Sequence, residues 1–347
     1  MPDKIKLAIA QGATCSGCDI AILDLDVELL KLFEVADLTY APLMCDMKLQ
    51  DVEAMADGEI TICLYHGAVR NSENEHIARL LRRKSVILVA YGACAAFGGI
   101  PGLANVTTRE RILDTVYDDT ATTVNPEHTR PQTRYVTPEG HELTLPELHE
   151  EVKALDDVVP VDYIIGACPP TREMNVKLLQ VVLDYVEGKA ELPPKGIILA
   201  CERTLCEECP REKPDKVTVD EIRSMDYTQP DPETCFLEQG ILCFGPATRG
   251  GCDSKCIKVN VPCRGCMGPT ATVLDHGGSM LSAFASILKV SDSDAELPEE
   301  DIEKLMSKMK DPLGTLYRFT LPKSLLKRVV RETGEEETGS DELSETS

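Results

Sequence analysis

Fifteen cysteines limit the folds open to this chain of 347 residues more than any other feature. Three Cys-x-x-Cys pairs are formed by Cys15 and Cys18, Cys206 and Cys209, and Cys263 and Cys266. An odd number of cysteines in such pairs is typical of metal binding in a reducing compartment, whereas disulfide frameworks belong to short secreted chains. The N-terminal apolar run is too short for an export signal, and no apolar stretch is long enough to span a membrane. We therefore expect a cytoplasmic protein with reduced thiols and no membrane span.

The first 190 residues alternate between strand-like and helix-like segments. Strand-like runs fall at 6–10, 38–43, 60–64, 85–91 and 162–165, and helix-like stretches at 20–33, 73–83 and 172–186. Such alternation predicts a doubly wound α/β domain with a parallel sheet. Residues 98–157 are polar and contain several Pro, Thr and His residues, so we expect an insertion outside the sheet.

Apolar periodicity fades after residues 192–194 (Leu-Pro-Pro), where the cysteine density rises. Nine of the fifteen cysteines lie between Cys201 and Met267. A segment with so little periodicity needs another source of folding energy, which metal ligation supplies. We expect four parts: a first domain at 1–190, a small irregular cysteine-rich domain at 191–290, a helical extension at 291–332 with short helices at 302–309 and 323–330, and an acidic disordered tail at 333–347.

The charge balance argues against nucleic acid as a partner. The chain carries 36 Lys and Arg against 59 Asp and Glu, a net charge of −23, and has 6 Phe, 9 Tyr and no Trp. Nucleic-acid binding by counterion release needs basic patches, and base stacking needs aromatic side chains. We expect no nucleic-acid partner.

Four cysteines follow predicted strands, at points that a doubly wound sheet brings together. Cys15 and Cys18 follow the first strand, Cys94 follows the strand at 85–91, and Cys168 follows the strand at 162–165. Ligands of such sheets bind outside the carboxyl ends of the strands, where helix N-termini offer N–H groups to anionic sulfur. The four thiols predict one site, with the ligand number that a 4Fe–4S cluster requires.

Other interpretations of these four residues fit less well. Cys94 or Cys168 alone would be an ordinary buried residue, as free cysteine often is, but both stand at strand ends beside Gly or Pro. A flavin-phosphate loop after the first strand would carry Ser, Thr, Gly or Asn in place of cysteine. Zinc also takes four cysteines, although structural zinc sites usually draw on closely spaced ligands.

The cysteine-rich region supplies two further sets of four. They are Cys206, Cys209, Cys235 and Cys243, and Cys252, Cys256, Cys263 and Cys266. Three sets of four account for twelve of the fifteen cysteines. Cys45 and Cys63 lie in or beside apolar sheet segments and are expected in the core. Cys201 is either a core residue or a replacement for one of the assigned ligands.

The pattern resembles the small subunit of the NiFe hydrogenases. The matching segments are CSGC at 15–18, GACAAFGG at 92–99, GACPP at 166–170, CEECPRE at 206–212, and the spaced cysteines through CRGC at 263–266. The resemblance spans about residues 5–270. The most similar form is the cytoplasmic hydrogenase of methanogens that reduces viologen dyes but not deazaflavin and couples to heterodisulfide reductase.

The resemblance implies a flavodoxin-like first domain followed by an irregular iron–sulfur domain. It assigns a proximal cluster to Cys15, Cys18, Cys94 and Cys168, a medial cluster to Cys252, Cys256, Cys263 and Cys266, and a distal cluster to Cys206, Cys209, Cys235 and Cys243. Exported relatives often have proline in place of Cys256 and usually have histidine in place of Cys206, so this chain is expected to hold three all-cysteine 4Fe–4S clusters.

The same resemblance implies an electron-transferring subunit without catalytic residues of its own. The NiFe centre would lie in a separate large subunit, and electrons would pass to a delta-type 2Fe–2S subunit and then to heterodisulfide reductase, in methanogenesis. One-electron chemistry of this kind belongs to the cofactors. His66, where relatives often carry an acidic residue, is expected either to tune the nearby cluster or to pack.

Two alternatives stay open. A zinc-stabilised scaffold or assembly protein is one, since CEEC and CRGC alone do not distinguish iron from zinc. The other is the small subunit of another hydrogenase, or of a complex I-like oxidoreductase, with a different acceptor. The complex I cluster subunit shares the GxC and GCPP turns, but it uses adjacent cysteines in its first motif and ends after its single cluster.

Overall fold

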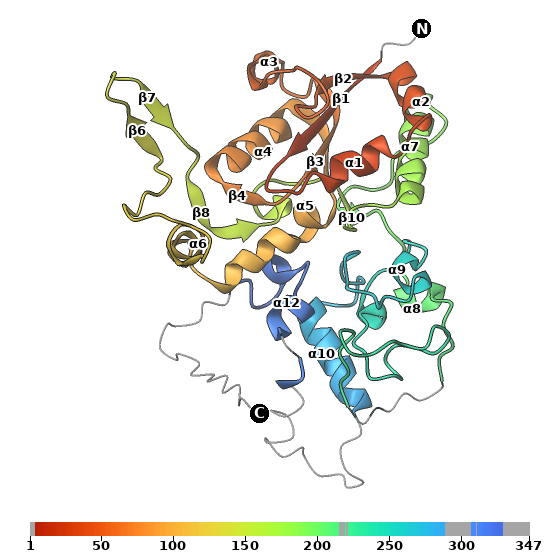
Figure 1. The fold of residues 1–347 in the computed structure, drawn as a ribbon. Helices are drawn as coiled ribbons and strands as arrows, with labels where there is room; N and C mark the ends of the chain where they lie inside the picture. The colour runs from red at the N-terminus through yellow and green to blue at the C-terminus, as the bar shows by residue number, and fades with distance from the viewer. Residues whose placement is uncertain (1–3, 215–218, 220, 289–306, 310, 329–347) are drawn as a thin grey trace.

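The computed structural model describes residues 4–214, 219, 221–288, 307–309 and 311–328. An α/β layer formed by the N-terminal part lies against a region of short helices formed by the C-terminal part (Figure 1). Within these described ranges, no helix has both the length and the apolar character that a membrane span requires.

The main sheet has six parallel strands in the order β10-β9-β5-β3-β1-β2. They are β1 (Ile5–Gln11), β2 (Ala36–Tyr40), β3 (Ile60–His66), β5 (Ser85–Tyr91), β9 (Tyr163–Ile165) and β10 (Ile197–Ile198). β2 pairs with one edge of β1. The next strand of the sheet, β3, pairs with the opposite edge of β1, and β5, β9 and β10 follow on that side. This reversal is the topological switch of a flavodoxin-like, doubly wound sheet, so the predicted fold class is confirmed.

Helices cover both faces of the sheet. One face carries α1 (Gly17–Leu23), α2 (Glu28–Val35) and α7 (Arg172–Val186), and the other carries α3 (Leu49–Ala54), α4 (Ser72–Lys84) and α5 (Ala93–Phe97). Alternate residues of β1 enter the two cores: Leu7 and Ile9 pack under α1, α2 and α7, and Ala8 packs on the opposite side. Because both faces are buried, the strands read as continuous apolar runs.

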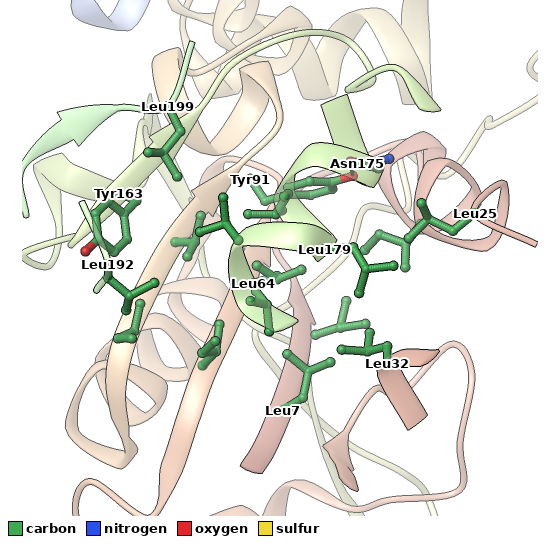
Figure 2. Close-up of a pocket in the computed structure, with 18 of the residues that line it drawn as sticks. Leu7, Leu25, Leu32, Leu64, Tyr91, Tyr163, Asn175, Leu179, Leu192 and Leu199 are labelled. Atoms are coloured by element: carbon green, nitrogen blue, oxygen red, sulfur yellow. Dashed lines mark hydrogen bonds between the residues drawn. The ribbon is translucent and has the colours of Figure 1, made fainter. Parts of the chain in front are cut away.

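The core under α1, α2 and α7 contains an apolar cavity (Figure 2). Leu7 and Leu64 line it from the sheet, and Leu179 lines it from α7. The Tyr91 hydroxyl donates to Asn175 Oδ1 at 2.7 Å, and Asn175 Nδ2 donates to the Ala21 carbonyl at 2.7 Å. These polar groups bond to one another and to the backbone, so they leave no free polar atom for a ligand. We therefore interpret the cavity as a loosely packed part of the core.

Residues 98–157 lie outside the main sheet, as predicted. Their elements are the 3₁₀ helix Ile100–Val106, α6 (Arg109–Asp114), the π-helical turn Thr115–Asp119, β6 (Arg134–Val136), β7 (Glu142–Thr144), β8 (Leu148–Lys153) and the 3₁₀ turn Leu155–Asp157. β6 and β7 form a hairpin that projects from the body (Figure 1), and β8 pairs antiparallel with β4 (Val69–Asn71).

The C-terminal part has little regular structure. It contains α8 (Leu205–Glu208), the 3₁₀ turn Gly245–Ala247, α9 (Lys255–Lys258), α10 (His276–Ile287), α12 (Pro312–Leu316) and the 3₁₀ turn Leu321–Lys323. Phe236, Phe244, Met280 and Leu321 belong to a core of its own.

Two expectations for the C-terminal extension have different outcomes. Residues 302–306 of the first predicted helix and the whole predicted tail at 333–347 lie outside the described residues. The second predicted helix is wrong in its described part, because residues 324–328 are not helical. The Ser324 hydroxyl accepts the backbone N–H of Leu326 and of Lys327, which holds a turn in place of a helix.

Residues 311–328, here called the returning segment, contact both parts of the molecule. On the α/β side, Pro322 fills the space over Gly98, where a Cβ would lie 2.3 Å from Pro322 Cγ, and Lys323 forms ion pairs with Asp156 and Asp157. On the other side, Leu325 N donates to Asp275 Oδ2 at 2.8 Å. The segment therefore fastens the C-terminal part to the sheet layer.

Candidate metal centres

The proximal set comes together at the carboxyl edge of the sheet. Cys15 precedes α1 and Cys18 lies in its first turn, Cys94 stands in α5 after β5, and Cys168 follows β9. Burial, together with the thiolates of Cys94, Cys168 and Cys15, raises the pKa of Cys18. Burial, then the thiolates of Cys168 and Cys15, raises the pKa of Cys94 to about 12. Such mutual effects require neighbouring sulfur atoms, so the four thiols share one site.

Two glycines leave the room that these sulfur atoms occupy. Gly92 has a φ of +85°, and a Cβ there would lie 2.5 Å from Cys18 Sγ. Gly99 has a φ of +57°, and a Cβ there would lie 2.5 Å from Cys94 Sγ. Glycine is therefore required at both positions, because a side chain would disfavour the backbone conformation and would also overlap a cysteine sulfur.

His66, the last residue of β3, contacts the residues that flank the CSGC loop at 15–18. Its side chain is fully buried, with Nε2 3.0 Å from Asp19 Oδ1 and Nδ1 3.4 Å from Thr14 Oγ1. Thr14 Oγ1 also accepts the backbone N–H of Ser16 at 3.2 Å. His66 therefore contacts the residues on both sides of the CSGC loop, and these contacts are compatible with both roles that the sequence left open for it.

The distal set lines a cavity of its own in the C-terminal part. Cys206 lies in α8, Cys209 follows it, and Cys235 and Cys243 lie on the loops around Phe236; the cavity holds about 310 Å³ of empty space, part of it open to solvent. Burial, then the thiolates of Cys243, Cys235 and Cys209, raises the pKa of Cys206 to about 12. The structure therefore brings together all four predicted members.

One further side chain of the distal cavity fits an anionic guest. Arg211, two residues after Cys209, lines the same cavity, and its Nε is buried without a hydrogen-bond partner. Buried N–H groups are nearly always paired in folded proteins. The four thiolates would ligate the iron of a 4Fe–4S cluster, and the unpaired N–H of Arg211 could donate a hydrogen bond to one of its sulfur atoms. The residues present therefore fit such a cluster.

The medial set lies between the other two. Burial raises the pKa of Cys266 to about 12, opposed by a hydrogen bond from the backbone of Cys168 of the proximal set, and the thiolates of Cys252 and Cys256 add to the rise. Burial raises the pKa of Cys263, to which Cys243 of the distal set adds. Backbone hydrogen bonds also connect the medial set to its two neighbours. Ala167, next to Cys168, donates its N–H to the Cys266 carbonyl at 2.9 Å, and Phe244, next to Cys243, donates its N–H to the Cys263 carbonyl at 3.0 Å.

Glu208 connects the CEEC motif to the medial set, which the sequence did not indicate. Its carboxylate accepts the backbone N–H of Gly251 at 2.8 Å and of Ser254 at 3.2 Å, and Cys252 Sγ lies 3.8 Å away. Glu208 and Arg211 both stand inside a quoted motif, but a linear pattern does not show which of its charged residues turn inward.

The three remaining cysteines lie outside the sets. Cys63 is fully buried in β3, where burial raises its pKa to about 12, and Cys45 is half-buried. Cys201 is half-buried. A hydrogen bond with Cys201 raises the pKa of Arg203, and burial lowers the pKa of Arg249, an effect that Cys201 partly opposes. Cys63 is thus in the core as expected, whereas Cys45 was expected there and is only half-buried, outside the core clusters.

No three Cys, His, Asp or Glu side chains are arranged closely enough to hold a single metal ion, as judged over the described ranges. A tetrahedral zinc site requires such a close group, with each sulfur about 2.3 Å from the ion. A four-iron cluster is a larger body that spreads its thiolate ligands. Burial raises the pKa of Cys94, Cys206 and Cys266 to about 12, so binding of a metal group would release protons from these thiols.

Comparison with known proteins gives the same picture from a separate direction. Residues 15–182 match the family model described as NADH ubiquinone oxidoreductase, 20 Kd subunit. The chain is 38% identical over 330 residues to the iron-sulfur subunit of the F420-non-reducing hydrogenase of Archaeoglobus profundus, covering 93% of this chain and 98% of the relative. It is 35% identical over 336 residues to a subunit of the F420-non-reducing hydrogenase of Methanothermobacter marburgensis, covering 96% and 100%.

A solved structure with a similar chain is that of an NAD+-reducing [NiFe]-hydrogenase in the H2-reduced state. It is 34% identical, with a TM-score of 0.45 over 55% of this chain and 96% of that chain. The two archaeal relatives named above match this chain over nearly its whole length. The chain is an oxidoreductase subunit, and it belongs to the family of NiFe hydrogenase small subunits that includes these two subunits of F420-non-reducing hydrogenases.

Proposed function

We propose that this chain carries electrons, one at a time, from H2 oxidation in a separate large subunit through three 4Fe–4S clusters. The observation that carries the proposal is the serial placement of the cysteine sets: Cys168 neighbours Cys266 at one end of the medial set, and Cys243 neighbours Cys263 at the other. Each cluster, when bound, accepts and releases one electron. The chain supplies no catalytic residue, and the NiFe centre belongs to the partner.

The protein sets the properties of each site through ligation, burial and hydrogen bonding. Backbone N–H groups lie near several of the ligand sulfurs; the N–H of Gly265, for example, donates to Cys263 Sγ at 3.4 Å. His66 and the glycines around Cys94 hold the proximal thiols in place, and Glu208 orders the backbone beside Cys252. These contacts place the ligands before a metal group arrives.

We propose further that electrons leave through the distal set to a delta-type 2Fe–2S subunit and then to heterodisulfide reductase. Full-length similarity to the two archaeal subunits supports a place in a hydrogenase of the F420-non-reducing type. We also propose a cytoplasmic place in methanogenesis and a division into a flavodoxin-like domain (1–190), a cluster domain (191–290) and a C-terminal extension (291–332) before the acidic tail (333–347).

The metal content of the anaerobically purified chain tests the cluster assignment. We expect brown protein with about twelve iron atoms and as many acid-labile sulfides per chain, because three sets of four thiolates each hold one 4Fe–4S cluster. The broad visible absorbance should bleach with dithionite. Colourless, zinc-loaded protein would contradict the proposal in favour of a scaffold role, and about eight iron atoms would show that one set is misassigned.

A further inference from the structure

Arg211 is a buried cation at the distal cavity that forms no ion pair with a described residue. Its side chain is 5% exposed and lines the cavity with Cys206, Cys209, Cys235 and Cys243. Charged groups are rarely buried to this extent unless an opposite charge compensates them, since desolvation of a lone charge costs several kcal/mol. The described residues place no carboxylate within ion-pair distance of its guanidinium group.

Neutral groups instead fix the guanidinium plane. Nη1 donates to the carbonyls of Asp231 at 2.6 Å and Thr234 at 2.5 Å, and Nη2 donates to Asn260 Oδ1. Hydrogen bonds from Thr234 and Glu233, and to a smaller extent the charge of Arg211, lower the pKa of the Asp231 carboxyl. Its Oδ1 accepts the N–H of Thr234 at 2.8 Å, and it forms no ion pair with Arg211. Arg211 Cζ lies 3.6 Å from the centre of the Phe236 ring. The orientation of Arg211 is therefore set by contacts that leave its Nε buried and unpaired.

We propose that Arg211 is a positioning residue for the distal cluster: its Nε–H donates to a ligand thiolate or an inorganic sulfide, and the negative charge of the cluster compensates the buried guanidinium group. The inference rests on the proposed cluster at Cys206, Cys209, Cys235 and Cys243. A four-iron cluster with four thiolate ligands is an anion, and its reduction adds one negative charge. A fixed cation beside it stabilises the reduced form more than the oxidised form and thus raises its reduction potential.

This placement has a consequence for electron flow. Arg211 lines the distal cavity, whereas the Asp19 carboxylate next to Cys18 in the proximal set contacts His66 Nε2 at 3.0 Å. A fixed, buried cation at the distal cavity favours the electron on the distal cluster. Arg211 would therefore direct electrons from H2 toward the exit.

Replacement of Arg211 in the intact complex tests the proposal by potentiometric EPR titration. In Arg211→Gln the equilibrium constant for one-electron reduction of the distal cluster should fall about tenfold, a shift of about 59 mV to lower potential. Lys213→Gln is the matched control, because Lys213 lines the same cavity but its Nζ is exposed and bonds the Cys209 carbonyl at 3.1 Å. The distal signal is the one that Cys235→Ser removes. Equal potentials in Arg211→Gln and Lys213→Gln would overturn the proposal.

A second measurement uses the unaltered chain, because Arg211→Gln also removes the partner of several carbonyls. With isotope-labelled arginine, the reduced distal cluster should show hyperfine coupling to an arginine nitrogen, and Arg211→Lys should lose that coupling. Its absence from the wild-type chain with about twelve iron atoms would refute the role of Arg211 and leave the cluster assignment standing. Wild-type protein without the distal signal would instead count against the proposed function.

Discussion

Cys18→Ser is expected to reduce the H2-dependent reduction of a viologen dye by the assembled complex by at least about 100-fold. Loss of a group that only orients a metal ligand commonly costs 10- to 100-fold, and loss of the ligand itself costs more. Cys18 lies in the first turn of α1, with the thiols of Cys15, Cys94 and Cys168 around it. Without the proximal cluster, electrons have no first acceptor outside the large subunit.

Cys63→Ser provides the matched control, because it makes the same chemical change at a buried cysteine outside the three sets. Cys63 is fully buried in β3, so the new hydroxyl should lower the free energy of unfolding by about 1–3 kcal/mol. Dye reduction by the folded fraction should stay close to that of the wild type. Wild-type activity in Cys18→Ser would remove Cys18 from the ligand set.

Gly92→Ala should prevent assembly of the proximal cluster while leaving the other two in place. The added Cβ would lie 2.5 Å from Cys18 Sγ, closer than nonbonded atoms approach, and the φ of +85° disfavours any side chain. We expect the iron content to fall from about twelve to about eight atoms per chain and H2-dependent dye reduction to be lost. Iron analysis and EPR of the dithionite-reduced complex measure both effects.

The cost of the backbone conformation is separated from the steric effect by Gly188→Ala. Gly188 has a φ of +67°, but a Cβ there would meet nothing within 4 Å. This variant should lose stability without losing iron. If Gly92→Ala retained the full iron content, the space beside Cys18 would not be needed for the cluster.

Much of the α/β layer and of the proximal set could be predicted because both follow from local patterns joined by a general rule. The alternation of apolar runs and helical stretches predicted a parallel sheet, and such sheets gather the carboxyl ends of their strands at one edge. Cys94 and Cys168 could therefore be placed near Cys15 and Cys18 despite the sequence distance. The same reasoning assigned residues 98–157 to an insertion.

The contacts that tune the sites could not be predicted in this way. Arg211 and Glu208 stand on a four-residue helix and the irregular chain after it, where no periodicity indicates which side is buried. His66 could be singled out but not interpreted, since its partners Thr14 and Asp19 come from another strand–helix turn. The helix expected at 323–330 fails because Ser324 bonds the following backbone, a local competition that hydrophobic spacing does not reveal.

The returning segment has a mechanical role if the chain passes electrons between clusters as proposed. Electron tunnelling slows steeply with each added ångström, so a carrier of this kind works only while its redox centres keep their separation. Pro322 is seated over Gly98 on the sheet side, and Leu325 is anchored to Asp275 beside α10. The returning segment thus opposes a hinge motion that would separate the proximal cysteine set from the medial and distal sets.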